Sequence, residues 1–323
     1  MRLFGLLTFF FAAFMAFTST AAGLPATSES FDDLVIGGTQ RYTPPSPKWS
    51  REEIAETQVL LDRAGFSPGV IDGKDTQRFR IALETYNAAN PGNAIAPSAL
   101  PQSDEPLFID YAITAKDVHG PFTPNIPVLY VNQASLAQIG FRNAREMLAE
   151  RFHVDENYLQ RVNPGADFSH AGTKIKVPNV GRFLEIRVAR IEADKSKLQL
   201  RAYAINDRLI AAYPASIGSQ DTPSPTGAHR VRNKAQNPQY TYDPNGSAQP
   251  GLSKGLVRLP AGPNGPVGDA WIGLSKRTYG IHGTPEPSEI GITASVGCVR
   301  LTNWDALELA RLVRRGVEVS FIE

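Results

Sequence analysis

The sequence predicts a multidomain α+β protein: a small helical domain, an α+β module, and a mainly β, sandwich-like domain with a C-terminal helix. The chain has 323 residues, and at about 100–200 residues per domain this length allows two or three domains. Apolar residues make up 42% and charged residues 20% of it, which excludes disorder throughout. Apolar residues recur at helical spacing in the first half and alternate from residue 183 onward, so helices precede the sheet.

The charge balance bears on possible partners. The chain has 33 Lys and Arg against 32 Asp and Glu, a formal net charge of +1. A polyanion binds to an excess of basic charge, so no nucleic-acid partner is expected.

The N-terminus has the pattern of a secretory signal peptide. A basic Arg2 precedes an apolar run from Leu3 to Phe17, and small residues follow at Ser19 to Ala22. A membrane span needs about 20 apolar residues; this run is shorter, and an uncleaved anchor is the alternative. We expect a signal peptide over 1–22, a linker over 23–49, a periplasmic location and no integral membrane span after cleavage.

Two helical stretches around a tight turn define a small domain over 50–90. The stretch Gln58–Gly73 contains Gly-Phe, Pro-Gly and Asp-Gly pairs, and Thr76 precedes a second helix that closes near Tyr86-Asn87. This order resembles the small helical peptidoglycan-binding domain; a generic helical hairpin is the alternative. A Pro- and Ala-rich linker over 91–105 follows.

A second module is expected over 106–180. A helical run from Ala144 to Phe152 and a final extended segment from Ile175 to Pro178 resemble a lysin motif, a strand-helix-helix-strand module that binds wall glycans. Between its first strand and first helix lie extra residues, around Gly120 to Gln133, that an ordinary lysin motif lacks. The module either binds glycan strands or serves as a packing adaptor.

The segment 181–323 has the residue pattern of an antiparallel sheet. Apolar residues alternate at period two over Glu185–Ile191 and Leu198–Tyr203. One helix is predicted over Trp304–Arg315, because Thr302 and Asp305 have capping-box spacing and Gly316 follows the basic last turn.

The candidate chemistry centres on Cys298, the single cysteine, which cannot form an internal disulfide. His282 lies 16 residues upstream. A cysteine nucleophile needs a base and backbone donors for an oxyanion, and the amides around Gly297 and Cys298 could supply them. Without further context, a buried inert thiol and a structural histidine fit equally well.

The wider motif is more specific. His282-Gly-Thr, Gly291, Ser295-x-Gly-Cys-Val-Arg-Leu301 and Asn303-x-Asp305 together resemble the L,D-transpeptidase catalytic domain of the YkuD type. Pro223–Gly227 and Asn237–Tyr240 resemble that family's strand and turn signals. Val296 stands where many members have a second histidine.

The resemblance implies roles for individual residues. Cys298 would be the nucleophile and His282 the base, while the Gly283 carbonyl would hold the other imidazole nitrogen. Ser295 and Gly297 would shape the loop and oxyanion site. Arg300 would anchor a substrate carboxylate or fix the loop. Tyr279 and Trp271 would line the cleft, or are ordinary core aromatics.

The resemblance also implies a reaction in peptidoglycan biosynthesis, and thus in cell wall organization and cell shape. Cys298 would release the terminal D-alanine of a wall tetrapeptide and pass the acyl group to an amine of another stem peptide, forming a 3-3 crosslink. Water as acceptor would give an L,D-carboxypeptidase, and a lysine would tether a lipoprotein to the wall. A non-catalytic wall-binding scaffold is the alternative from a different class.

No metal or cofactor is expected from the sequence. The remaining histidines lack the paired spacing of a zinc site, and neither a phosphate-binding loop nor a dinucleotide fingerprint occurs. These histidines are His119, His153, His170 and His229. We expect them to have structural or surface roles.

Overall fold

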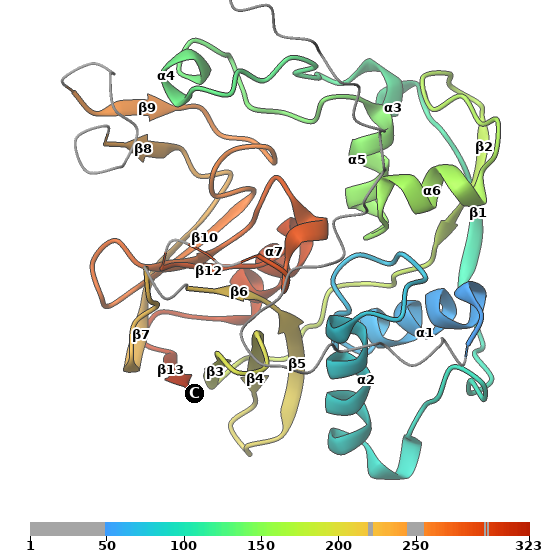
Figure 1. Ribbon diagram of the computed structural model, residues 1–323, viewed down its shortest axis with the longest axis horizontal. Coiled ribbons are helices and arrows are strands. Elements are labelled where there is room, and N and C mark those ends of the chain that lie inside the picture. Colours follow the sequence, from blue (N-terminus) through green and yellow to red (C-terminus); the bar gives the residue numbers. More distant parts are fainter. Residues whose placement is uncertain (1–48, 219–221, 244–254, 294, 296) are drawn as a thin grey trace, which may run out of the picture. The chain divides into compact units, whose positions relative to one another are not determined.

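The computed structural model describes residues 49–218, 222–243, 255–293, 295 and 297–323 (Figure 1). The predicted signal peptide, nearly all of the 23–49 linker and Val296 lie outside these residues. From Trp49 onward the described residues belong to one compact unit. In the part of the chain that is described, no helix combines the length and apolar character needed to cross a bilayer.

The first described segment is a helical pair, α1 (Arg51–Arg63) and α2 (Gln77–Ala89). Helix α1 begins where it does because Ser50 and Glu53 form a reciprocal capping box. Buried Gln58, on α1, donates to Oδ1 of Asp72, in the loop between the helices, at 2.9 Å. It also accepts from the Asp72 amide at 3.0 Å. This exchange fixes the Asp-Gly turn seen in the sequence.

The predicted linker over 91–105 is partly folded. It contains a 3-10 turn, η1 (Pro91–Asn93), and buries Ile95 in the apolar cluster of the helical pair. Asn87 accepts from the Ile95 amide at 2.9 Å and donates to its carbonyl at 3.0 Å. Two hydrogen bonds and a buried side chain therefore attach this segment to α2.

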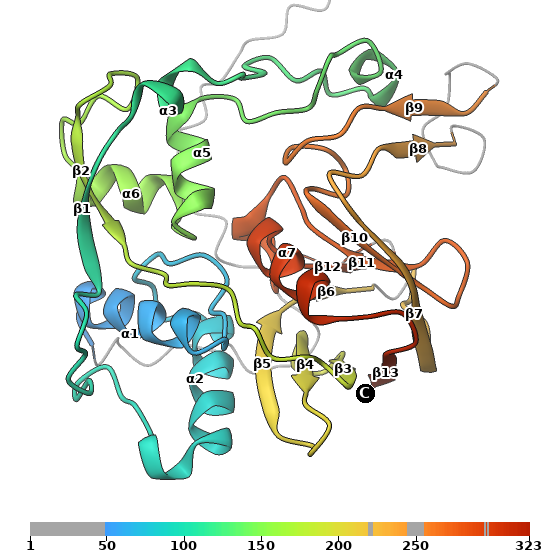
Figure 2. The same cartoon turned by 180° about the vertical axis from the view of Figure 1, so that it is seen from behind.

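The second segment has the strand-helix-helix-strand order, with additional helices after its first strand (Figure 2). Strands β1 and β2 pair antiparallel, and Asn143 and Asp155 cap the two principal helices, α5 and α6. The elements are β1 (Phe108–Ala112), α3 (Ala115–His119), α4 (Tyr130–Gln133), α5 (Ala144–Arg151), α6 (Glu156–Val162) and β2 (Lys174–Pro178). Its core also includes Val59 and Ile71, so the two segments share one apolar cluster.

The third segment is a nine-stranded sheet in the order β5-β4-β3-β13-β7-β10-β11-β12-β6. Strand β7 joins its two halves, since Gly227–Arg230 pair with β13 and residues further along pair with β10. The strands are β3 (Arg190–Asp194), β4 (Gln199–Tyr203), β5 (Leu209–Pro214), β6 (Ser216–Ile217), β7 (Gly227–Gln236), β10 (Ala270–Leu274), β11 (Gly280–His282), β12 (Val299–Arg300) and β13 (Glu318–Ile322). A separate hairpin pairs β8 (Tyr240–Tyr242) with β9 (Val257–Leu259), and a 3-10 turn, η2 (Pro287–Glu289), precedes β12.

Two sequence predictions for this segment need correction. The helix, α7 (Asn303–Leu312), is capped by Thr302 as expected but ends three residues early. Val313 is extended, and Lys234 Nζ caps the carbonyls of Ala310 and Val313 at 2.6 and 2.8 Å. A strand, β13, follows α7, so the chain does not close on a helix.

The strand predicted over Glu185–Ile191 was also placed too early, because β3 starts at Arg190. The Val188 amide donates to the Leu312 carbonyl at 3.2 Å. Val188 therefore contacts the end of α7, whereas the Ala189 amide already donates to the Tyr203 carbonyl of β4 at 2.8 Å.

Long-range hydrogen bonds join the helical pair to the sheet. Phe66 forms a parallel bridge with Ala212, the Ser67 amide donates to Ala212 O at 2.8 Å, and Ser67 Oγ donates to Asp305 Oδ2 at 2.9 Å. Because β5 is an edge strand, this loop covers backbone groups that would otherwise be open to pairing with another chain.

A buried carboxyl joins the second segment to the sheet. Glu150, on α5, accepts from Asn303 Nδ2 at 2.9 Å. Burial raises the pKa of Glu150 well above its usual range, although the Asn303 hydrogen bond opposes the shift. The folded protein therefore favours the protonated form of Glu150 more than the unfolded chain does.

We expect Glu150→Gln to change the pH dependence of stability. A carboxyl whose folded pKa is raised stabilises the fold below its unfolded pKa and loses that contribution as pH rises. The variant, neutral at every pH, should gain stability relative to wild type as the pH rises above the unfolded pKa of the carboxyl, as measured by urea midpoints. Exposed Glu84→Gln serves as the control; a stability difference that does not vary with pH would contradict the assignment.

Candidate active site

The pairing of β11 with β12 brings His282 and Cys298 to the same face of the sheet. Ile281 lies opposite Val299 in a parallel register, and both are buried in the core. Since side chains alternate along strands, His282 points away from this core, and extending the alternation by one residue before β12 puts Cys298 on the same face. With strands about 4.8 Å apart and a rise of about 3.3 Å per residue, their Cα atoms are roughly 8 Å apart.

His282 is held as a neutral base. Its Nδ1 donates to the Gly283 carbonyl at 2.7 Å, the contact expected from the sequence, so Nε2 has the lone pair. Trp271 stacks on the imidazole with centroids 5.6 Å apart and planes 20° from parallel. Burial lowers the pKa of His282 to about 4, with Arg300 contributing to the decrease. At neutral pH the ring can accept a proton.

Cys298 is a partly exposed thiol beside β11. Its Sγ lies 3.7 Å from the Thr278 carbonyl. Burial raises the pKa of Cys298, and a hydrogen bond from the Gly280 amide partly offsets the increase. At neutral pH the folded protein therefore favours the thiol form of Cys298 and the neutral form of His282.

Serine hydroxyls orient the loop before the cysteine. Ser224 Oγ donates to Gly297 O at 2.8 Å, Ser295 Oγ donates to Cys298 O, and the Gly218 amide donates to Ser295 Oγ at 2.7 Å. Because a trans peptide is planar, holding the Gly297 carbonyl also fixes the direction of the Cys298 N–H. That N–H is the predicted oxyanion donor.

The backbone conformation at position 297 favours glycine. Its φ is +91°, and an added Cβ would lie 3.0 Å from Tyr279 Cε1. Tyr279 is half-buried, and Lys276 Nζ lies 4.2 Å from its ring centroid. The predicted cleft residue therefore packs directly against the nucleophile loop.

Asn303 fixes the turn that bears the histidine. Its Oδ1 accepts from the amides of Asp269 and Thr284 at 3.2 and 3.1 Å, and an added Cβ at Gly283 would overlap with it. Neither Asn303 nor Ser224 was among the predicted site residues, although both lie within motifs of the family resemblance. Their contacts are long-range and have no local sequence signal.

Arg300 lies level with His282 in the strand register. Its Nη2 donates to Thr293 Oγ1 at 3.0 Å, and burial lowers its pKa. The sequence left two roles open for Arg300, anchoring a substrate carboxylate or fixing the loop. The contact with Thr293 supports the second role.

A groove of about 370 Å³ adjoins this site. Thr278, whose carbonyl faces Cys298 Sγ, lines it together with Trp271 and Tyr279. Arg232 and Arg315 also line it, and two guanidinium groups favour carboxylate ligands.

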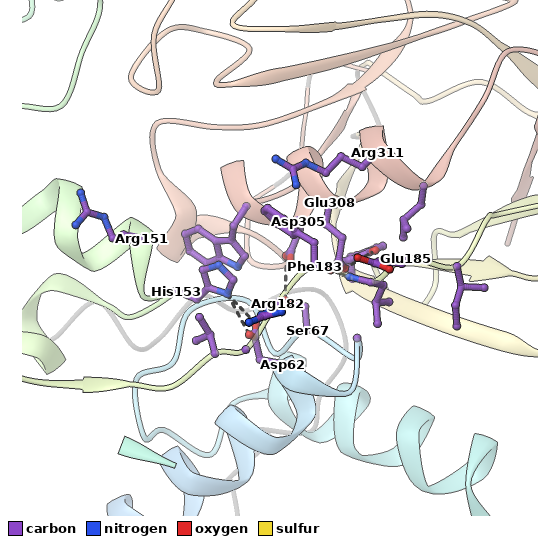
Figure 3. Close-up of a pocket in the computed structure, with 18 of the residues that line it drawn as sticks. Asp62, Ser67, Arg151, His153, Arg182, Phe183, Glu185, Asp305, Glu308 and Arg311 are labelled. Carbon is purple, nitrogen blue, oxygen red and sulfur yellow. Dashed lines mark hydrogen bonds and ion pairs between the residues drawn. The ribbon is translucent and has the colours of Figure 1, made fainter. Parts of the chain in front are cut away.

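A different pocket, of about 730 Å³, lies where all three segments meet (Figure 3). Figure 3 shows Asp62 beside His153 and Ser67 beside Asp305. His153 Nδ1 lies 3.0 Å from Asp62 Oδ2, and Ser67 Oγ donates to Asp305 Oδ2. Among the described residues, its wall includes none of the predicted site residues. Within the same described ranges, no three His, Cys, Asp or Glu side chains are grouped to hold a metal ion.

A neutral histidine with a fixed tautomer, a cysteine on the neighbouring strand and an oriented backbone donor form the arrangement that cysteine acyltransferases require. Residues 189–320 match the YkuD model, the L,D-transpeptidase catalytic domain. The chain is 34% identical over 177 residues to the putative L,D-transpeptidase YkuD of Bacillus licheniformis, covering 54% of this chain and 91% of that protein. It belongs to the L,D-transpeptidase family.

Two further comparisons cover smaller shares of the matched proteins. The probable L,D-transpeptidase YcfS of Escherichia coli is 30% identical over 186 residues, which is 55% of this chain and 58% of that protein. The crystal structure of L,D-transpeptidase 3 from Mycobacterium tuberculosis is 19% identical, covers 47% of this chain and 76% of that chain, and has a TM-score of 0.35. The chain thus spans little more than half of the Escherichia coli relative.

Proposed function

We propose that the protein is an exported, cysteine-dependent L,D-transpeptidase that joins peptidoglycan stem peptides through 3-3 crosslinks. The observation that supports this most directly is the β11–β12 register, in which His282 lies opposite Arg300 and Cys298 directly precedes Val299. The predicted periplasmic location and signal peptide remain part of the proposal.

The proposed first half-reaction uses His282 and Cys298. His282 Nε2 accepts the thiol proton as Cys298 Sγ bonds to the carbonyl carbon between the third residue of a tetrapeptide and its terminal D-alanine. The Cys298 N–H stabilises the oxyanion. As the C–N bond breaks, the imidazolium returns the proton to the departing D-alanine amine, leaving a thioester.

The second half-reaction reverses these proton transfers. An amine of a second stem peptide gives a proton to His282 and bonds to the thioester carbon; the C–S bond breaks, and the sulfur recovers the proton. Water in place of the amine would make the same site an L,D-carboxypeptidase, and a protein lysine would attach a lipoprotein. The site residues are the same for each acceptor.

The groove beside the site supports an acidic peptide as substrate. Arg232 and Arg315 can each bind a carboxylate of the donor or acceptor peptide. Trp271 and Tyr279 form its apolar wall, which makes them substrate-binding residues in this proposal, with Arg300 at the loop behind them.

The contacts of the accessory segments favour one of the roles predicted for them. Hydrogen bonds from Ser67 to Asp305 and from Asn303 to Glu150 attach them to the sheet. The Asn303–Glu150 contact supports the packing-adaptor alternative for the lysin-motif-like segment.

The experiment is to incubate the purified protein with a disaccharide tetrapeptide and identify the products by mass spectrometry. A crosslinked dimer that has lost one D-alanine supports the proposal. Tripeptide alone supports the carboxypeptidase, and unchanged substrate with folded protein supports the non-catalytic scaffold. A second arm with a lysine-containing peptide tests protein attachment.

A further inference from the structure

The helical pair contacts the segment of chain that connects His282 to Cys298. Arg78, on α2, donates from Nη1 to the Ser288 carbonyl in η2 at 2.8 Å, across 210 residues of sequence. An added Cβ at Gly291, three residues after Ser288, would lie 3.8 Å from Arg78 Cβ. The arginine therefore lies along this segment and is also hydrogen-bonded to it.

Arg78 is itself held in one orientation. Its Nη2 donates to Asp72 Oδ2 at 2.9 Å, and the two side chains are only 6% and 3% exposed. The other oxygen of that carboxylate accepts from Gln58 at 2.9 Å. A guanidinium presents its donors in a rigid, planar fork, so the bond to Asp72 also fixes the direction in which Nη1 points. The Asp-Gly turn of the helical pair thus directs a donor at the catalytic segment.

The turn that Arg78 holds is the base of the loop that follows it. Glu289, next to Ser288 in η2, accepts through its carbonyl from the amides of Ile292 and Thr293, both at 3.1 Å. The same carbonyl accepts from Thr293 Oγ1 at 3.3 Å. Backbone and side chain of Thr293 are therefore both anchored to η2.

Thr293 connects this turn to the strand that follows the cysteine. Its Oγ1 accepts from Arg300 Nη2 at 3.0 Å. Arg300 lies opposite His282 in the strand register and two residues after Cys298. A displacement of η2 would therefore move the hydroxyl group that holds Arg300 beside the proposed nucleophile and base.

The second segment contacts the same turn through a longer bond. Ser288 Oγ donates to Asp155 Oδ2 at 3.4 Å, whereas the other oxygen of Asp155 caps α6. The bond from Arg78 is shorter and has a charged donor, and such bonds are roughly twice as strong as neutral ones. The helical pair is thus the stronger of the two supports of η2.

We propose that Arg78 is a positioning residue for the cysteine site: it fixes η2 and, through Thr293, the orientation of Arg300 beside Cys298 and His282. This rests on the proposed function. The helical pair then contributes to acyl transfer through its Asp-Gly turn, in addition to any binding of the wall.

The test follows the rate of Cys298 acylation by a carbapenem with intact mass, which needs no peptide substrate. The variants are Arg78→Ala, Thr293→Val and their combination. We expect each single variant to react about tenfold more slowly than wild type, since small displacements caused by distant changes cost this much or more. The double variant should react within about twofold of the slower single variant, because both changes interrupt the same chain of contacts.

The double variant separates positioning from a merely structural role. Independent effects would multiply to a loss of about a hundredfold, and that result would overturn the proposal. An unchanged rate in folded Arg78→Ala, or a Thr293→Val variant that reacts like wild type, would also overturn it.

Arg63→Ala is the matched control. Arg63, on α1, also attaches the helical pair to distant backbone, but its partners are the carbonyls of Asn179 and Pro106 in the second segment, at 2.5 and 2.6 Å. We expect this variant to be acylated within about twofold of the wild-type rate, because its contacts do not lead to η2. A tenfold loss in Arg63→Ala as well would mean that any loosening of the helical pair slows the reaction, and would contradict the role of Arg78.

A second variant covers the case in which Arg78→Ala does not fold. The alanine variant leaves the buried Asp72 carboxylate unpaired, which is strongly destabilising. If circular dichroism shows that it is unfolded, Asp72→Asn/Arg78→Met replaces it, because this variant removes both charges of the pair. The same loss of about tenfold and the same non-additivity with Thr293→Val are expected.

Turnover of the tetrapeptide is the second readout. A loop that orients the nucleophile acts on the transition state, so kcat should fall about tenfold in Arg78→Ala while KM changes less than threefold. A rise in KM at constant kcat would overturn the positioning role. A wild-type protein that forms the carbapenem adduct but no peptide product would refute the proposed function and leave the positioning role intact.

Discussion

Replacing Cys298 with alanine should abolish acyl transfer. The sulfur is the atom that forms the thioester, and no other cysteine exists in the chain, so nothing can substitute for it. We expect turnover of the tetrapeptide to fall by about 10⁴-fold or more, in line with the loss of a nucleophile in other acyl-transfer enzymes. Product formation is measured by mass spectrometry under the conditions that give the wild-type dimer.

A carbapenem provides the matched control for this prediction. Intact mass should show one covalent adduct on wild type and none on Cys298→Ala, while thermal melts of the two proteins remain close because Cys298 is only partly buried. Residual turnover by the variant, or an adduct on it, would show that another residue is the nucleophile.

The second large effect is expected for His282→Gln. The variant keeps a polar side chain but lacks the basic Nε2, so kcat/KM should fall by about 10²- to 10⁴-fold. For wild type, we expect activity to decline as pH falls towards 4, where the imidazole becomes protonated, since burial lowers the pKa of His282 to about 4. This histidine-dependent acid limb should be missing from the variant's profile.

The same residue should affect acid stability. Between the unfolded pKa of about 6.5 and the folded pKa of about 4, the unfolded chain binds a proton that the folded chain excludes. Stability is therefore lost as pH falls through this window, by roughly 3 kcal/mol in total. The difference between wild type and His282→Gln should change by that amount between pH 7 and pH 4 in urea unfolding. Exposed His170→Gln is the control, and a constant difference would argue against a buried neutral imidazole.

Features that depend on a few neighbouring residues were predictable from the sequence. Ser50 and Glu53 lie three positions apart and form a capping box; Thr302 and Asp305 have the same spacing, and there the Thr302 side chain alone caps α7, by accepting from the Asp305 amide. The start of α5 at Ala144 was likewise predicted from helical spacing. The Cys298 motif and the Ile-His-Gly-Thr turn were recognisable because each occupies a short, ordered string.

Only the tertiary structure showed how these short sequence motifs are brought together. Strand pairing of β11 with β12 put His282 and Cys298 on one face, although a shift of one residue would have separated them. Ser224 reaches Gly297 across 73 residues of sequence, and Tyr130 meets Tyr240 from a different segment.

By itself, then, the sequence determined the helix starts, the nucleophile motif and the family. The strand register and the orientation of the cysteine loop became known only from the folded chain. Capping and periodicity act within one or two turns of chain, whereas register and long-range contacts depend on how distant segments close on one another.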